Sequence, residues 1–100
     1  MTISSDDMLA AGITYRQLDY WCRTGYLRPD VASPGTGVRR RFPSEEFEIA
    51  RLMVLLTAVG VEPSAAARAA REGIESGQPY GLLSDRVAVI WRPEQTGDAA

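Results

Sequence analysis

The fold is decided by residues 14–27, which read Thr14-Tyr15-Arg16-Gln17-Leu18-Asp19-Tyr20-Trp21-Cys22-Arg23-Thr24-Gly25-Tyr26-Leu27. The threonine at its start and the glutamine three residues later form a capping-box pattern, which marks the beginning of a helix. Leu18, Trp21 and Cys22 follow at i, i+3 and i+4 spacing, which predicts one buried helix face. Gly25 predicts the C-terminal end of that helix.

The segments on either side predict a helix-turn-helix followed by a wing. Upstream, an acidic turn followed by apolar residues predicts a short helix over residues 5–11, which Gly12 ends. Two short helices joined by a tight turn that contains glycine are typical of a helix-turn-helix. Downstream, short extended pieces at 26–28 and 39–42 flank a segment rich in Pro and Gly, which predicts a hairpin with a loose tip. A hairpin in this position is a wing.

The rest of the chain predicts two further helices and a second hairpin. One helix runs from an N-cap at Ser44 to Gly60 and is apolar nearly all round, which indicates burial on more than one face. The next, over 64–75, is rich in alanine, and short strands are expected at 82–83 and 87–91. Four charged side chains of the alanine-rich helix are expected to form a solvated face: Arg68, Arg71, Glu72 and Glu75.

The predicted fold class is therefore mostly α with small β. It is a winged helix-turn-helix of about four helices, with a two-stranded wing and a C-terminal β-hairpin. We expect the winged helix-turn-helix domain to span residues 1–78 and the hairpin to span 79–92, packed on the domain or on a partner. Residues 93–100 form a polar tail that we expect to be flexible.

Composition excludes several classes of function. A chain of 100 residues with 45% hydrophobic residues suits one small domain and is too apolar for an intrinsically disordered chain. No apolar run approaches the ~20 residues of a membrane span, and the N-terminus lacks the basic and apolar segments of a secretory signal, so we expect a cytoplasmic protein. One cysteine and no histidine argue against a zinc site and against a His-based catalytic triad. We expect no enzyme activity, metal or cofactor.

Charge is concentrated in one segment. Residues 13–41 carry six arginines against two aspartates, a net charge of +4, in a chain whose formal net charge is −2. Attraction to phosphate depends on the local patch more than on the total charge. The segment that contains the helix-turn-helix and the wing is thus the candidate surface for nucleic acid.

These residues resemble the MerR family of winged helix-turn-helix proteins. Residues 14–27 share the skeleton of that family's second helix and exit turn: a capping Ser or Thr, then Leu, two consecutive aromatics, Gly and Leu. Arg39-Arg40-Arg41-Phe42 resembles the end of the wing, where basic residues precede an aromatic, and Val59-Gly60-Val61 resembles the turn before the fourth helix. The resemblance covers roughly residues 5–75.

The resemblance implies that the helix from Thr14 to Arg23 lies in the DNA major groove. Tyr15 and Arg16 would then be nearest the base edges, and Tyr20 would approach a phosphate through its hydroxyl. The wing arginines would contact phosphates or enter the minor groove. The DNA-binding residues implied in this way are Thr14, Tyr15, Arg16, Gln17, Asp19, Tyr20, Arg23, Arg39, Arg40 and Arg41.

Two features depart from the family pattern. Asp19 stands where the family often has arginine, so a phosphate contact is lost or the carboxylate accepts a hydrogen bond from a cytosine amino group. The helix pair ends near Glu75 and gives way to a hairpin, where the family has a long dimerising helix and an effector domain. The resemblance is therefore to small relatives without an effector domain, and we expect no small-molecule ligand.

Three functions follow from this interpretation. The first is a sequence-specific protein for double-stranded DNA that regulates transcription on the nucleoid, with a homodimer or partner surface over residues 47–59 and 82–91. The second is a phage excisionase that bends DNA. The third is a protein-interaction module that uses the helix-turn-helix only as a scaffold.

Overall fold

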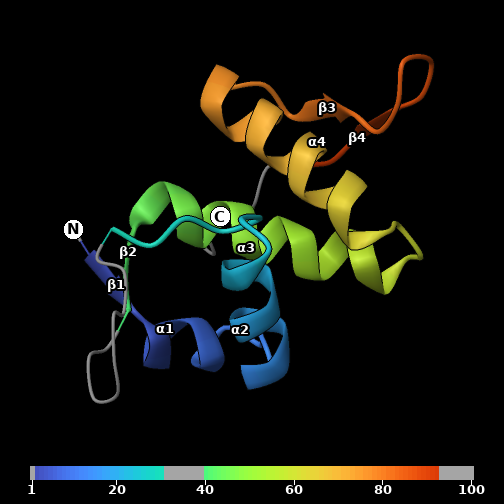
Figure 1. The fold of residues 1–100 in the computed structure, drawn as a ribbon. Coiled ribbons are helices and arrows are strands. Elements are labelled where there is room, and N and C mark those ends of the chain that lie inside the picture. Colours follow the sequence, from blue (N-terminus) through green and yellow to red (C-terminus); the bar gives the residue numbers. More distant parts are fainter. Residues whose placement is uncertain (1, 31–39, 93–100) are drawn as a thin grey trace, which may run out of the picture.

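The computed structural model describes residues 2–30 and 40–92. Within these ranges the chain is mostly helical, with two small antiparallel sheets, as expected for a winged helix-turn-helix (Figure 1). The elements follow in the order β1 (Thr2–Ser4), α1 (Ser5–Ala10), α2 (Tyr15–Arg23), β2 (Arg41–Pro43), α3 (Ser44–Ala58), α4 (Pro63–Ser76), β3 (Tyr80–Leu82) and β4 (Ala88–Ile90).

Helices α1 and α2 form the predicted helix-turn-helix. A capping box starts α1: the Asp7 N–H donates to Ser4 Oγ at 3.1 Å, and the Ser4 N–H donates to Asp7 Oδ2 at 3.0 Å. The turn between the helices needs a left-handed residue, which is Gly12 at φ 101°. Ile13 follows it into the core and fixes how the two helices meet.

The small sheet beside the helix-turn-helix differs from the prediction in its pairing. Strand β2 pairs antiparallel with β1, with Phe42 opposite Ile3, and the strand expected over 26–28 is not formed. The reason is that the backbone of 26–28 is already engaged by hydrogen bonds to α2, α3 and α4. One backbone bond joins the chain just after this segment to β2, from the Asp30 N–H to the Arg41 carbonyl at 2.7 Å. The expected hairpin tip and Arg39 lie outside the described residues.

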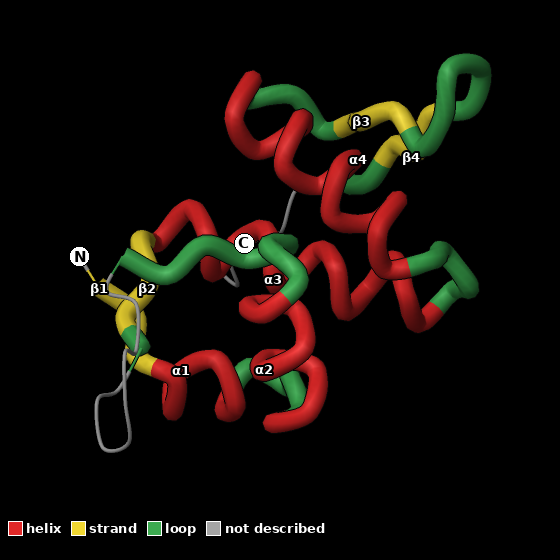
Figure 2. The backbone as a smooth tube through the Cα atoms, in the orientation of Figure 1, coloured by secondary structure: helices red, strands yellow, loops and turns green. Residues whose placement is uncertain are grey.

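Helix α3 lies at the centre of the molecule, between the helix-turn-helix and α4 (Figures 1 and 2). It buries a stripe that meets the apolar face of α2 and the side chain of Phe42 in one core. The stripe consists of Ile49, Ala50, Met53 and Leu56. The helix starts one residue before the position expected: Pro43, not Ser44, is the N-cap, and no side chain caps the helix. Pro43 is part of β2, so its extended backbone leads the chain directly into the first turn.

Helix α4 and the C-terminal hairpin pack so closely that glycine is needed at two of the contact positions. Gly81 of β3 lies so close to the backbone of Ala69 that a Cβ atom there would collide with it. Gly73 of α4 lies in the same way against the ring of Trp91, just after β4. The two predicted strands therefore pair with each other, Tyr80 opposite Ile90, and cover α4. The first strand begins two residues earlier than expected.

Candidate nucleic-acid interface

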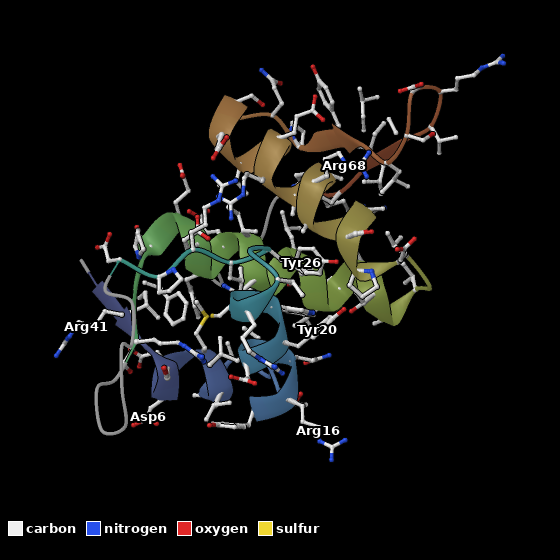
Figure 3. The ribbon with its side chains drawn as sticks, in the orientation of Figure 1. Asp6, Arg16, Tyr20, Tyr26, Arg41 and Arg68 are labelled. Carbon is white, nitrogen blue, oxygen red and sulfur yellow. The ribbon has the colours of Figure 1, made fainter. Side chains whose placement is uncertain are left out.

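The N-terminal end of α2 presents two exposed side chains on a rigid base. The predicted capping box is confirmed: the Gln17 N–H donates to Thr14 Oγ1 at 3.1 Å, and the Thr14 N–H donates to Gln17 Oε1 at 3.0 Å. Both of these side chains therefore hold the helix end in place. Tyr15 and Arg16 follow the cap, both exposed, and Figure 3 shows Arg16 pointing away from the body of the protein. The capped helix end thus holds Arg16 and Tyr15 on a fixed backbone with their side chains in solvent.

The two consecutive aromatics of α2 have opposite surroundings. Trp21 is buried with Leu18, which confirms the predicted core face. Tyr20 is 50% exposed, and its ring meets the ring of Tyr26 edge-to-face with 6.2 Å between centroids. This contact orients Tyr20 while leaving half of the side chain accessible, which the phosphate contact implied by the family resemblance requires (Figure 3).

Asp19 joins α2 to the base of the wing. Its Oδ1 accepts a hydrogen bond from Arg40 Nη2 at 3.1 Å, and its Oδ2 lies 3.0 Å from Arg23 Nε on the same helix. The bond from Arg40, with the added charge of Arg23, outweighs the desolvation of the carboxylate and lowers the pKa of Asp19 below its ordinary value. Asp19 is therefore ionised at neutral pH, and it holds two of the expected DNA-binding arginines.

The wing arginines point in different directions, as strand alternation requires. Arg40 reaches toward α2, whereas Arg41 is exposed and points outward from β2, away from the body of the protein (Figure 3). Phe42, the next residue, is fully buried. Arg39 lies outside the described residues, so its predicted role stays a prediction.

A buried ion pair, which the sequence interpretation missed, fixes the exit of α2. Arg71 of α4 donates from Nη1 to Glu46 Oε2 at 2.7 Å and from Nη2 to Glu46 Oε1 at 2.8 Å. Arg71 Nη2 also donates to the Tyr26 carbonyl at 2.9 Å, and Glu46 Oε1 accepts the Arg28 N–H at 2.8 Å. The prediction of a solvated Arg71 was wrong. Its guanidinium instead joins α3, α4 and the segment that leaves α2.

Helical spacing carried a signal for this pair. Glu46 precedes the buried Ile49 and Ala50 by three and four residues, and Arg71 follows the buried Ala67 by four. Each charge interrupts an apolar stripe, and a long charged side chain on a buried stripe needs a partner. Burial alone would raise the pKa of Glu46, but the hydrogen bonds from Arg71 and from the Arg28 N–H outweigh it and lower that pKa.

Cys22 is a packing residue at the edge of the same core. It is half-buried, and burial raises the pKa of its thiol. The protonated thiol is neither a good nucleophile nor a metal ligand. Among residues 2–30 and 40–92, no group of three His, Cys, Asp or Glu side chains is arranged to hold a metal ion. Within the same residues, no helix combines the length and the apolar character needed to cross a membrane.

Comparison with known proteins identifies the arrangement. Residues 9–73 match the family described as MerR HTH family regulatory protein; this range includes the last two residues of α1, all of α2, β2 and α3, and most of α4. The chain belongs to the MerR HTH family. The family resemblance noted in residues 14–27 and 59–61 is thereby confirmed.

Sequence relatives cover part of the same region. The chain is 38% identical over 52 residues to an uncharacterized HTH-type transcriptional regulator of Mycobacterium bovis and, to the same extent, to two such regulators from strains of Mycobacterium tuberculosis. The match covers 51% of this chain and 23% of each relative, so the chain corresponds to a minor part of their length. No solved structure is significantly similar to the chain.

Proposed function

We propose that this MerR HTH protein binds double-stranded DNA sequence-specifically and regulates transcription on the nucleoid, without catalysing a reaction. The observation that carries the proposal is the coupling of α2 to Arg40 at the base of the wing. Asp19 ties Arg40 to the same helix that presents Tyr15 and Arg16 to solvent. A reading helix and a phosphate-binding segment are thus held in one fixed relation.

The exposed residues of α2 suit a major groove. A helix that enters the groove reads bases from its N-terminal residues, and Tyr15 and Arg16 occupy that position here. Arginine donates two parallel hydrogen bonds to the O6 and N7 atoms of guanine, which makes Arg16 the first candidate for base readout. Thr14 and Gln17 contribute by fixing the helix end, with their remaining polar capacity directed to the backbone of DNA.

The proposed phosphate-binding residues come from α2 and from the region of β2. Arg41 is exposed on β2, Arg23 is exposed at the end of α2, and the Tyr20 hydroxyl is accessible beside Tyr26. Contacts of this kind orient the protein on the duplex without reading sequence. Arg39 and Arg40 complete the proposed set at the wing.

Selection of bound fragments from genomic DNA with the purified chain tests the proposal. Enrichment of one sequence motif, with a log affinity that falls linearly with log salt concentration, is the expected result. Half-sites about 10 base pairs apart would show two copies bound side by side. A chain that binds no duplex at low salt would overturn the proposal.

The partner surface over 47–59 and 82–91 stays a prediction. Apolar side chains on α3 and on the hairpin support it, because they are exposed although both elements contribute to the core. They are Leu55, Val59, Leu82, Val87 and Ile90. Sedimentation of the chain at micromolar concentration, with and without its DNA site, measures whether two copies associate.

A further inference from the structure

Asp19 satisfies both carboxylate oxygens with arginines of the proposed DNA surface. Oδ1 is bonded to Arg40 and Oδ2 to Arg23, at 3.1 and 3.0 Å. Its side chain is 32% exposed, that of Arg40 24% and that of Arg23 69%. The group is thus neither buried in the core nor fully solvated. It lies where α2 and β2 meet.

The chemistry of this contact is the chemistry of a phosphate contact. A guanidinium binds a carboxylate and a phosphate through the same N–H donors and the same two-oxygen geometry. Asp19 therefore offers to Arg40 and Arg23 what a DNA backbone would offer. It is also the only acidic residue of α2, in a helix that carries Arg16 and Arg23.

We propose that Asp19 is a specificity-determining residue that competes with DNA phosphates for Arg40 and Arg23 and so keeps binding to random DNA weak. The proposal rests on the proposed function. Binding to random DNA is almost wholly electrostatic and takes whatever phosphates a flexible arginine can reach. While Asp19 binds Arg40 and Arg23, these two arginines are less free to reach phosphates of random DNA.

Binding to the correct site does not depend on releasing them. Base contacts from Arg16 and Tyr15 set the register of the protein on the duplex, and the ion pair keeps the base of the wing in a fixed relation to α2. In that register the N–H groups that Asp19 leaves free can meet phosphates, because each guanidinium has five donors, whereas a duplex bound in another register would have to draw the arginines away from Asp19. The carboxylate thus penalises loosely bound complexes more than the specific one.

Asp19→Asn tests the proposal in the full chain, with the selected site and a scrambled duplex of the same length as probes. The substitution keeps the size of the side chain and removes its charge. We expect the slope of log affinity against log salt on scrambled DNA to steepen by about 0.9 for each arginine released. Each arginine released corresponds to roughly tenfold tighter scrambled binding at about 50 mM salt, with a smaller gain on the selected site.

Asp85→Asn is the matched control, because it removes the same charge from the exposed turn between β3 and β4, far along the chain from α2. We expect scrambled binding by this variant to equal that of the unsubstituted chain. Arg40→Gln, made with and without Asp19→Asn, then asks whether the effect passes through Arg40. It should remove more scrambled affinity when Asp19 is absent than when Asp19 is present.

Three outcomes overturn the proposal. One is a scrambled-DNA slope that is unchanged by Asp19→Asn, and another is strict additivity with Arg40→Gln. The third is a loss of affinity for the selected site with scrambled binding unchanged, which would assign Asp19 to base readout, as a hydrogen bond to a cytosine amino group requires. A chain that binds no DNA before substitution fails the proposed function itself, and this result differs from each of the three.

Discussion

Two ion pairs between distant segments of the described chain, Glu46 with Arg71 and Asp19 with Arg40, differ in burial and thereby in what they can do. Glu46 and Arg71 have 6% and 13% of their side chains exposed, and their hydrogen bonds to each other, to the Tyr26 carbonyl and to the Arg28 N–H join α3, α4 and the segment that leaves α2. Asp19 and Arg40 have 32% and 24% exposed and lie beside solvent. A buried pair cannot exchange its partner for a phosphate, because either charge alone would be stranded. A pair at the surface can exchange its partner, because water solvates the charge that is released.

The difference assigns each pair a separate task. Glu46 and Arg71 fix Tyr26 and Arg28, so they hold the segment that leaves α2 against α3 and α4. Asp19 and Arg40 connect the helix and the wing on the outside of the same junction. Changes to the first pair should therefore appear in stability, and changes to the second in DNA binding.

Arg71→Met should have the largest effect. It leaves the Glu46 carboxylate buried without its partner, and breaking a buried pair in this way costs about 3–5 kcal/mol of unfolding free energy. Urea denaturation measures the loss. Arg68→Met is the matched control, because Arg68 is exposed on the same helix (Figure 3), and it should change stability by less than about 0.5 kcal/mol.

Replacing both partners, with Glu46→Met and Arg71→Met together, should cost less than Arg71→Met alone. The double variant removes the stranded charge and leaves only the Arg28 N–H and the Tyr26 carbonyl to find water. If Arg71→Met costs no more than Arg68→Met, the buried pair does not hold the junction together and the comparison between the pairs fails.

Gly81→Ala should have the next largest effect. An added Cβ atom meets the backbone of Ala69, which cannot move without shifting α4, so a cost of about 1–3 kcal/mol is expected. Thermal unfolding measures it. Because the strain lies on the far side of α3 from α2, DNA affinity per folded molecule should be unchanged. A lower affinity at full folding would show that the hairpin contributes to the DNA surface.

Arg41→Ala should produce a smaller effect, and only on DNA. Loss of one phosphate contact should reduce the salt slope by about 0.9 and weaken selected and scrambled duplexes alike, by roughly tenfold at about 50 mM salt. Arg16→Ala is the contrasting variant, which should weaken the selected site more than the scrambled one. Equal losses on both duplexes for Arg16→Ala would remove Arg16 from base readout.

Acid should have the smallest effect of these changes, a gradual decrease in the free energy of unfolding as the pH is lowered from 6. The pKa of Glu46 is lower in the folded chain than the ordinary 4.5. The pair therefore contributes its full stability above about pH 4.5 and loses it as pH falls through the folded pKa. Unfolding free energy measured from pH 6 downward should decline less steeply in the Glu46→Met, Arg71→Met double variant. Identical slopes would show that Glu46 does not couple folding to protons.

Much of the helix-turn-helix could be predicted from residues that are neighbours along the chain. The Thr14 and Gln17 cap, the Leu18 and Trp21 face and the exposed Tyr20 all depend on spacings of three or four residues. The pairing of β2 could not be predicted in this way. Residues 26–28 have a suitable strand sequence, but their backbone groups are taken by α2, Glu46 and Arg71.

Local sequence was thus enough for the α2 cap, the approximate positions of the helices and the family, because a cap or an apolar stripe is complete within one or two helical turns. It was not enough for the cap of α3, where the extended backbone of Pro43 takes the place expected for Ser44. The partner of each paired charge depends on the tertiary structure, which brings distant segments of the chain together. Asp19 and Arg40 are 21 residues apart, and Glu46 and Arg71 are 25. An arginine can pair with any acidic residue that packing brings near, so its partner cannot be read from the local sequence. The burial of the pair then determines whether it can only stabilise the fold or can also exchange its carboxylate for a phosphate.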